Sequence, residues 1–366
     1  MPGSFPPKWR AAALAAVLIA ALPIAAPPFA TPARADETPP PEQQAAFNAW
    51  LAQYRADAPA RGLQSAWIDA ALTDVKLLPR VIGSDRSQPA SAARPIRFAD
   101  YLAAKFRGDR VSHGQKKVVE QRSALATAER ATGVPAAVIA AVWGIETSYG
   151  RVLGRTDLPS ALATLAFDGR RGELFTRELD AVVRMVGEGR VTRAQLVGSW
   201  AGAFGQAQFL PSSYLAHGAD GDGDGKVDLW ASNADVFASI GTYLARAGWV
   251  RGEGWGFRVL PPEGFDRASV AEPVAPTRCV APLKRHSALK PARDWKALGF
   301  TPVNGAWPAD DVPMSLIEPD GDGQGAYLVT RSYRAILGYN CSNYYALSVA
   351  LLADALVLPA TAQAAP

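Results

Sequence analysis

The chain has 366 residues, of which 49% are hydrophobic and 20% charged, so it can bury a large core, and intrinsic disorder and fibrous repeats are excluded. The first 35 residues contain three basic residues and no acidic one, and the remaining chain holds 35 basic and 34 acidic residues. Proteins that bind nucleic acid concentrate positive charge, so we expect no nucleic acid among the partners of this nearly neutral chain.

The first 35 residues have the organisation of a secretory signal peptide. Lys8 and Arg10 form a basic start, residues 11–22 are apolar, and residues 33–35 form a small-x-small cleavage site. The apolar stretch ends at Pro23, short of the about 20 residues that a membrane-spanning helix needs. No cysteine lies near the cleavage site to carry a lipid anchor, so we expect a soluble, periplasmic product.

The segments after the signal peptide are predicted to be a flexible lead-in, a helical region and an exposed loop. Residues 36–46 are polar and rich in proline, which favours flexibility. From Phe47 onward apolar residues recur at three-to-four spacing, as in a helix. Residues 82–94 carry Gly, Ser, Pro and charged residues, which predicts the exposed loop.

Two helices are predicted in the middle of the chain. Residues 112–131 have the pattern of one long amphipathic helix with Val118, Val119 and Leu125 facing inward. Residues 135–148 begin with a proline, which the first turn of a helix tolerates, and continue with ten uncharged residues. A helix that is apolar all round is a buried one, so this second helix is predicted to lie in the core.

The second half of the chain is predicted to combine helices with a small mixed lobe. Residues 251–338 are rich in proline and glycine and include short segments such as residues 326–330, which predict strands. Further helices are predicted at residues 174–187, 234–247 and 344–358.

Glu146 is the candidate for acid chemistry. It follows the uncharged stretch and has Trp143, Ile145 and Tyr149 as sequence neighbours. Desolvation disfavours the ionised form of a carboxyl group and raises its pKa, which suits proton donation to a leaving oxygen near neutral pH. The alternative is a structural Glu that has reached solvent or pairs with Arg151.

A second carboxylate is not apparent near Glu146. Ordinary glycosidases use two, the second as a nucleophile or as a base for water. Asp157 and Asp168 are candidates by proximity in sequence alone. A mechanism with one carboxylate requires the substrate to supply an internal nucleophile.

Residues 198–209 interleave small residues with aromatic residues and two amides, Gln206 and Gln208. Small side chains permit close approach of backbone or ligand. Amides offer both a donor and an acceptor, which suits the hydroxyl and acetamido groups of sugars. The alternative is tight packing of a helix with glutamines that face solvent.

Residues 220–235 have the pattern of an EF-hand-like calcium loop. Alternate residues carry carboxylates, Gly225 allows a sharp turn, and repulsion among close carboxylates favours a bound cation. Ala231 stands where a bidentate Glu is usual, so Asp235 is the candidate that closes a lengthened loop. The candidate ligands are Asp220, Asp222, Asp224, the carbonyl of Lys226, Asp228 and Asp235.

A similar run at residues 320–325 lacks oxygen-bearing residues downstream. It therefore predicts a glycine-rich turn that leads into a strand.

Cys279 and Cys341 are the two cysteines of the chain. An oxidising compartment permits them to pair, and two unpaired buried thiols are the alternative. We expect the disulfide on the ground of compartment alone.

Four motifs in register, at residues 142–150, 161–171, 198–214 and 220–230, together resemble the lytic murein transglycosylase B family. The resemblance implies a mainly α (α+β) fold. Its parts are a lysozyme-like helical core at about residues 132–250 with an EF-hand-like calcium loop, an extra helical lobe, and a small mixed α/β lobe at about 251–338. The catalytic domain is expected to cover residues 47–358, before a tail at residues 359–366.

The resemblance also implies cleavage of the β-1,4 bond between N-acetylmuramic acid and N-acetylglucosamine in peptidoglycan. Glu146 is expected to act as acid and then as base, while the C6 hydroxyl of the muramic acid attacks C1 and leaves a 1,6-anhydro end. The residues implied to contact the glycan are Ser199, Gln208, Tyr101, Arg170, Arg171, Tyr243, Tyr339 and Tyr345.

The same resemblance sets the expected cofactors and partners. No cofactor is expected for the chemistry, and Ca²⁺ is expected to be structural. The expected partners are peptidoglycan glycan strands, with complexes of cell-wall synthesis or hydrolysis as a second class, and the expected oligomeric state is a monomer. Two other functions stay open: a muramidase that uses water instead of the C6 hydroxyl, and a non-catalytic peptidoglycan-binding protein.

Overall fold

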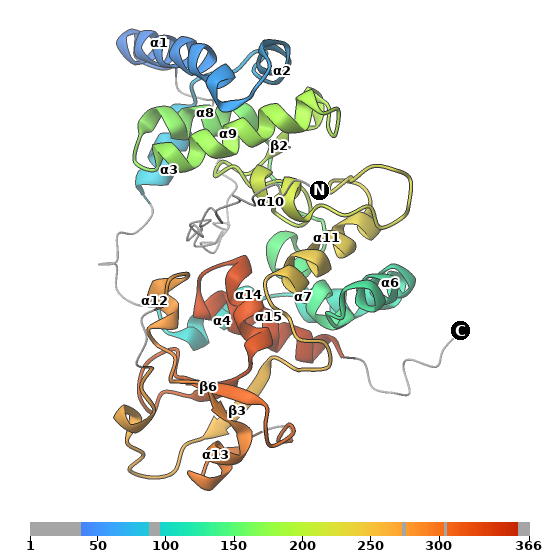
Figure 1. The fold of residues 1–366 in the computed structure, drawn as a ribbon, viewed down its shortest axis with the longest axis vertical. Helices are drawn as coiled ribbons and strands as arrows, with labels where there is room; N and C mark the ends of the chain where they lie inside the picture. Colours follow the sequence, from blue (N-terminus) through green and yellow to red (C-terminus); the bar gives the residue numbers. More distant parts are fainter. Residues whose placement is uncertain (1–37, 88–95, 273–275, 304–305, 358–366) are drawn as a thin grey trace, which may run out of the picture.

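The structure is a computed structural model that describes residues 38–87, 96–272, 276–303 and 306–357. The expected signal peptide and the expected tail at residues 359–366 lie outside these residues. Along the long axis of the molecule a helical lobe lies at one end and a lobe with a β-sheet at the other, with a group of helices between them (Figure 1).

The helical lobe is built from two segments of the chain that are distant in sequence. Helices α1, α2 and α3 come from the N-terminal part of the chain, and they pack on α8 and α9 (Figure 1). The bounds are α1 Pro41–Asp57, the 3₁₀ turn η1 Ala58–Arg61, α2 Ser65–Ala71, α3 Pro79–Arg86, α8 Leu158–Asp168 and α9 Gly172–Gly187.

Two expectations for the N-terminal region are wrong. Residues 41–46 belong to α1 and not to a flexible lead-in, because Pro41 occupies the first turn, where a proline is tolerated, and Phe47 and Tyr54 are buried. The predicted loop at residues 82–94 begins inside α3, which buries Ile82 and Asp85. The polar composition of this segment predicted exposure, but Asp85 can be buried because it forms ion pairs with two arginines.

The central group of helices surrounds α7 (Ala136–Thr147), which is buried along nearly its whole length, as its uncharged sequence predicts. Helices α5, α6, α11 and α15 pack against α7. The bounds of the central helices other than α7 are α4 Phe98–Lys105, α5 Arg110–Glu120, α6 Arg122–Thr132, α10 Pro211–His217, α11 Asn233–Arg246, α14 Arg331–Tyr339 and α15 Asn343–Leu356.

The single long helix predicted at residues 112–131 is two helices. The backbone breaks at Gln121, where φ is −102° and ψ is 15°, so that α5 and α6 pack on α7 separately. Leu125 is fully buried and Val118 is partly buried, but Val119 is 47% exposed. Consecutive residues of an α-helix lie about 100° apart around its axis. Because α5 packs on the core through Val118, Val119 faces solvent.

The mixed lobe holds an antiparallel five-stranded sheet with the order β4-β6-β7-β3-β5. It has its own small core, which includes Val259, Trp295, Met314 and Leu328. The strand predicted at residues 326–330 is present as β7. The elements are β3 Gly256–Leu260, η3 Arg267–Val270, α12 Val280–Leu283, β4 Lys290–Pro291, α13 Ala292–Ala297, β5 Thr301–Pro302, β6 Pro313–Ile317 and β7 Ala326–Val329.

Cys279 and Cys341 form a disulfide with a Cα–Cα distance of 5.1 Å. It ties the residue before α12 of the mixed lobe to the residues that lead into α15 of the core.

Within the described ranges, no single helix has the length and apolar character to cross a membrane. Helices α6 and α7 meet that test only as a pair, which is bent by 113°.

Candidate active site

The C-terminal end of α7 carries Glu146 and then reverses sharply. Ser148, Tyr149 and Gly150 follow with φ angles of +53°, +62° and +81°. Two successive non-glycine residues in the left-handed region are uncommon, and such strain concentrates at functional sites. The Thr147 hydroxyl supports the reversal, because it accepts a hydrogen bond from the Gly150 amide at 3.1 Å and donates one to the Gln206 carbonyl at 3.0 Å.

Glu146 is a half-buried carboxyl group with a raised pKa. Burial raises its pKa to about 7, while a hydrogen bond from Tyr345 and the charge of Lys105 oppose that rise. The Tyr345 hydroxyl donates to Oε1 of Glu146 at 2.6 Å. The alternative of an ion pair with Arg151 is wrong, because Arg151 pairs with Asp109 at 3.1 Å.

A row of tyrosines extends from Glu146 across three helices. Tyr345 of α15 lies parallel to Tyr339 of α14, with ring centroids 6.4 Å apart, and Tyr339 lies 4.7 Å from Tyr243 of α11. Their hydroxyls are fixed: Tyr339 donates to the Ala207 carbonyl at 2.6 Å and Tyr243 to the Gly338 carbonyl at 2.8 Å. The structure therefore brings together three of the tyrosines named from sequence.

Helix α4 supplies Tyr101 and Lys105 to the same site. Burial and the neighbouring Glu146 raise the pKa of Tyr101 to about 12. Lys105 was not identified from sequence, yet it is buried, and its Nζ lies 5.6 Å from the centre of the Tyr101 ring. Residues four apart lie on the same face of a helix. The spacing of Lys105 from Tyr101 therefore could have indicated that both belong to this site.

Residues 199–209 form a folded loop that contains no helix, so the alternative of tight helix packing is wrong. Two isolated β-bridges hold the loop, one between Gly198 and Phe204 and one between Phe204 and Phe209. The Ser199 hydroxyl accepts a hydrogen bond from the Ala203 amide at 3.0 Å. Gln208 has a φ of +48°, and its amide nitrogen donates to the Gly205 carbonyl at 2.9 Å.

Gln206, which the sequence named only as one of the two amides in residues 198–209, is buried. Its Oε1 accepts a hydrogen bond from Trp143 Nε1 at 2.7 Å, three residues before Glu146. Its Nε2 donates to the Trp230 carbonyl and to Asn233 Oδ1, both at 3.1 Å. Gln206 therefore joins the helix of Glu146 to the loop at residues 220–235, which we call the acidic loop. In the sequence, the signal for this position was an amide between two small residues.

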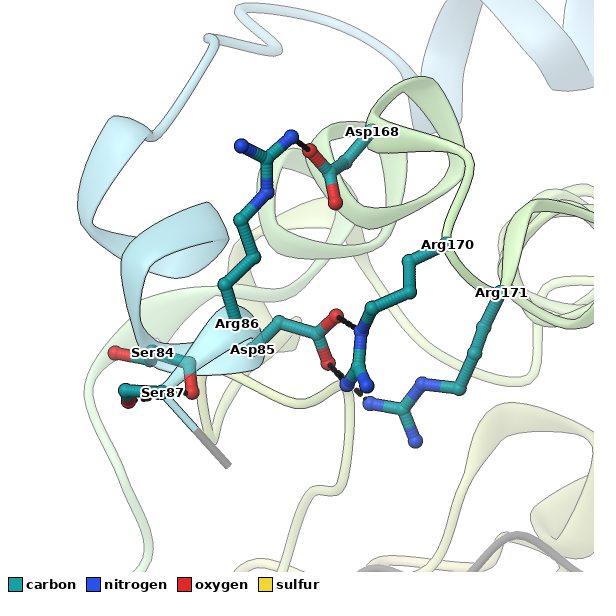
Figure 2. A network of polar contacts seen from close by, with 7 residues as sticks. All are labelled: Ser84, Asp85, Arg86, Ser87, Asp168, Arg170 and Arg171. Carbon is teal, nitrogen blue, oxygen red and sulfur yellow. Dashed lines mark hydrogen bonds and ion pairs between the residues drawn. The ribbon is translucent and has the colours of Figure 1, made fainter. Parts of the chain in front are cut away.

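Arg170 and Arg171 lie between α8 and α9 and converge on Asp85 of α3 (Figure 2). The carboxyl group of Glu146 accepts its hydrogen bond from Tyr345. Asp85 was not identified from sequence, where it was assigned to an exposed loop.

The two carboxylates considered as partners of Glu146 are engaged elsewhere. Asp157 pairs with Arg193 at 2.6 Å and accepts a hydrogen bond from the Ser160 amide at the start of α8. Asp168 pairs with Arg86 at 2.5 Å (Figure 2). Both are held by arginines in structural ion pairs.

In the acidic loop, Asp220, Asp222 and Asp235 each place a carboxylate oxygen within 4.8 Å of the others. In the part of the chain that the structure describes, no other His, Cys, Asp and Glu side chains gather this way. Asp235 is 1% exposed, and burial together with the charges of Asp222 and Asp220 raises its pKa. Three oxygen donors at this spacing fit a hard cation such as Ca²⁺.

The carboxylates of the other two expected aspartate ligands, Asp224 and Asp228, are not part of this group. Asp224 accepts a hydrogen bond from the Lys226 amide at 2.8 Å. Asp228 accepts from the Trp230 and Ala231 amides at 2.8 and 2.9 Å. Their carboxylates therefore stabilise turns of the loop.

The run at residues 320–325 is a turn that precedes β7, as predicted. Asp320 accepts hydrogen bonds from the Phe98 amide at 2.7 Å and from the Tyr344 hydroxyl at 2.5 Å. This carboxylate thus serves contacts between the mixed lobe and the core.

Comparison with known proteins places this chain in a family. The family model described as Transglycosylase SLT domain matches residues 46–354. The membrane-bound lytic murein transglycosylase B of Escherichia coli K12 is 30% identical over 305 residues, which are 81% of this chain and 79% of that one.

Solved structures agree with the sequence relatives. SltB3 of Pseudomonas aeruginosa, in complex with NAG-anhNAM-pentapeptide, is 36% identical, with a TM-score of 0.75 over 85% of this chain and 79% of that one. The Escherichia coli lytic transglycosylase Slt35, in complex with calcium, is 28% identical, with a TM-score of 0.66 over 84% of this chain and 92% of that one. Because the family model covers more than half of the sequence, the chain belongs to the Transglycosylase SLT domain family of lytic murein transglycosylases.

Proposed function

We propose that this lytic transglycosylase cleaves the β-1,4 bond between N-acetylmuramic acid and N-acetylglucosamine in peptidoglycan, with Glu146 as its acid and then its base. The observation that carries the proposal is the half-buried Glu146, whose pKa of about 7 leaves much of it protonated at neutral pH. A carboxyl group in this state donates a proton to a leaving oxygen efficiently.

The reaction needs one carboxyl group and no water. Glu146 gives its proton to the glycosidic oxygen, the bond from that oxygen to C1 of the muramic acid breaks, and N-acetylglucosamine leaves with a free 4-hydroxyl. The Glu146 carboxylate then takes the proton of the muramic acid C6 hydroxyl, whose oxygen bonds to C1 and closes the 1,6-anhydro ring. Glu146 ends protonated and ready for another cycle. Engagement of Asp157 and Asp168 by arginines supports this scheme over one with two carboxylates.

The neighbours of Glu146 hold the group in place for both steps. Tyr345 donates to Oε1, which orients the carboxyl group and stabilises the ionised form that acts as base. Lys105 adds a positive charge that favours the same ionised form. The glycan is proposed to contact Tyr101, Arg170, Arg171, Ser199, Gln208, Tyr243, Tyr339 and Tyr345.

The acidic loop is proposed to be an EF-hand-like Ca²⁺ site with a structural role. Asp220, Asp222 and Asp235 would hold the ion, and Asp224, Asp228 and the Lys226 carbonyl are proposed as further ligands after rearrangement of the loop. A bound cation supplies no reactive group here and relieves the repulsion among the carboxylates. The relation to Slt35, described in complex with calcium, supports the proposal.

The cell-wall substrate agrees with export to the periplasm through a signal peptide at residues 1–35, which is also part of the proposal. Relatives have been solved with NAG-NAM-pentapeptide and NAG-anhNAM-pentapeptide, so peptide-bearing glycan strands are the proposed partner.

The test is digestion of purified sacculi by Glu146→Gln, with the products measured by mass spectrometry. We expect wild-type enzyme to release muropeptides with anhydro ends, one water lighter than reducing ends, and the variant to release none. Glu178→Gln is the matched control, because Glu178 is another buried carboxyl group with a raised pKa, but Ser212 binds it. We expect this control to keep its activity.

The same digest separates the alternatives. Products with reducing ends would assign the chain as a muramidase that uses water. Release by Glu146→Gln at the wild-type rate would remove Glu146 from the mechanism, and no release by the wild-type enzyme would favour a non-catalytic binding protein.

A further inference from the structure

Gln206 forms hydrogen bonds through all of its polar groups. The residue is 6% exposed, and its backbone amide donates to the Leu229 carbonyl at 2.7 Å. Its Oε1 accepts from Trp143 Nε1 at 2.7 Å, and its backbone carbonyl accepts from the Thr147 hydroxyl at 3.0 Å. Its Nε2 donates to two further acceptors. This one buried residue therefore binds two other parts of the chain.

Two of these hydrogen bonds hold the last turn of α7, which carries Glu146. Trp143 and Thr147 are four residues apart, so they lie on one face of the helix. Gln206 binds Trp143 through its side chain and Thr147 through its carbonyl. The rotation of this turn, and with it the direction in which Glu146 leaves the helix, is therefore fixed from the loop at residues 199–209.

The reversal after α7 closes over the same amide. Gly150 has a φ of +81°, and a Cβ at this position would collide with Oε1 of Gln206, so a glycine is required there. The Gly150 amide donates to the Thr147 hydroxyl at 3.1 Å. The chain before Glu146 and the chain after it thus both pack against Gln206.

The other side of the amide is anchored at the end of the acidic loop. Nε2 of Gln206 donates to the Trp230 carbonyl and to Asn233 Oδ1, both at 3.1 Å. Asn233 is the first residue of α11, and α11 itself packs against α7. Without the Gln206 amide, Trp143 Nε1 would be buried without this acceptor, which is costly, so we expect the end of α7 to shift.

We propose that Gln206 is a positioning residue, which fixes the end of α7 so that the Glu146 carboxyl group reaches first the leaving oxygen and then the muramic acid C6 hydroxyl. This inference rests on the proposed function, in which Glu146 acts in both steps. Gln206 does not touch the reacting atoms and acts through Trp143 and Thr147. A group that serves two oxygens in turn tolerates little displacement, since a shift of about 1 Å can lower a rate about a hundredfold.

The test is Gln206→Met, which keeps the approximate length of the side chain and removes its amide. KM and kcat are measured on a soluble peptide-bearing glycan, and Kd is measured calorimetrically with NAG-anhNAM-pentapeptide. We expect kcat to fall at least about tenfold, while KM and Kd stay within about twofold. Binding should persist because Ser199 and Gln208, the proposed glycan contacts of this loop, are held by the Ala203 amide and the Gly205 carbonyl and not by the Gln206 side chain.

Thr164→Val is the matched control. Thr164 of α8 is fully buried, and its hydroxyl accepts a hydrogen bond from the Leu78 amide at 3.0 Å. The variant therefore loses a buried hydrogen bond in the helical lobe with little change of shape. It should melt at a lower temperature and keep the wild-type kcat, KM and Kd. A purely structural Gln206 would behave in the same way, so wild-type kcat in folded Gln206→Met would overturn the inference.

A second variant guards against a folding defect in the first. Trp143→Phe removes the donor to Oε1 and keeps an aromatic ring in the core, so it should fold and also lower kcat with little change in KM. The double variant should be no slower than the slower single variant, because both substitutions break one hydrogen bond. Fully additive losses of kcat would mean that the Gln206 side chain does not act through Trp143.

The digest by Glu146→Gln separates this inference from the proposed function. If Glu146→Gln releases nothing and Gln206→Met keeps the wild-type kcat, only the inference about Gln206 fails. If Glu146→Gln releases muropeptides at the wild-type rate, the proposed acid is wrong, and the inference that Gln206 positions it fails as well.

Discussion

At the scale of single residues, Glu146 is balanced between two opposing influences. Burial favours its protonated form, and Tyr345 and Lys105 favour its ionised form. An acid that must later act as a base needs both states within reach, and a pKa near 7 gives that at neutral pH. In the proposed mechanism, these two neighbours are therefore expected to set the pH dependence of the enzyme.

Tyr345→Phe should move the alkaline limb of the pH profile upward. Glu146 must begin protonated, so activity falls as pH rises through its pKa of about 7. Tyr345 donates to the carboxylate and lowers that pKa, so loss of its hydroxyl raises the pKa and shifts the limb by about one pH unit. The measurement is kcat/KM against pH.

Tyr339→Phe is the control for this shift, because its hydroxyl donates to the Ala207 carbonyl instead. Even if Tyr339→Phe changes the rate, the alkaline limb of its pH profile should keep the midpoint of the wild-type enzyme. A limb that moves downward in Tyr345→Phe, or equally in both variants, would contradict this assignment.

The sequence predicted Glu146 and not its surroundings. An uncharged stretch before a carboxyl group predicts burial of that group, and the structure places Glu146 at the end of a buried helix. Tyr345 lies 199 residues away along the chain, so no local pattern joins it to Glu146, and it was named through the family resemblance. Asp85 was missed because its polar neighbours in sequence gave no sign of the arginines that permit its burial.

At the scale of elements, helix existence was predictable and helix breaks were not. The apolar spacing of residues 112–131 continues across Gln121, yet α5 and α6 pack on α7 as separate helices. The spacing of apolar residues predicts which faces of a helix are buried. It does not predict how the neighbouring elements that cover those faces are oriented. The acidic loop shows the same limit, because the sequence identified its carboxylates but not which of them gather.

Calcium should stabilise the protein through the acidic loop. A ligand at a hundred times its Kd adds about 2.7 kcal/mol to the free energy of unfolding, so we expect the melting temperature to rise by several degrees in Ca²⁺ and to fall on chelation. Asp235→Asn should abolish the response, because Asp235 belongs to the cluster and also accepts from the Gly221 and Asp228 amides at 2.8 and 2.7 Å. Scanning calorimetry with and without chelator measures it.

Asp320→Asn provides the comparison, since Asp320 lies in the similar run that forms a turn to β7. This variant should keep the full calcium response, whatever its own stability. A melting curve of the wild-type protein that ignores chelation would argue against a bound ion.

At the scale of the whole molecule, the site is assembled from segments that the fold brings together from distant positions. Helix α4 supplies Tyr101, α7 supplies Glu146 and α15 supplies Tyr345. The mixed lobe has a separate small core, and its connection to α15 therefore matters for the site. The disulfide and a buried polar cluster both make that connection. In the cluster, His286 contacts Asn343 Oδ1 at 2.9 Å, and Asn343 donates to the Pro282 carbonyl at 3.0 Å.

Loss of the disulfide should lower stability more than activity. The two cysteines are 62 residues apart, and closure of a loop of that length restricts the unfolded chain by about 4 kcal/mol. The double variant Cys279→Ser with Cys341→Ser should therefore melt at a clearly lower temperature, and reductant should lower the melting temperature of the wild-type protein but not that of the variant. Because the cluster of His286 and Asn343 still holds the start of α15, kcat at 25 °C should stay within about twofold of wild type. A wild-type melting curve unchanged by reductant, under conditions where both thiols are shown to be free, would mean that the bond adds nothing. Loss of kcat in the folded double variant would instead mean that the disulfide, and not the polar cluster, fixes Tyr345 beside Glu146.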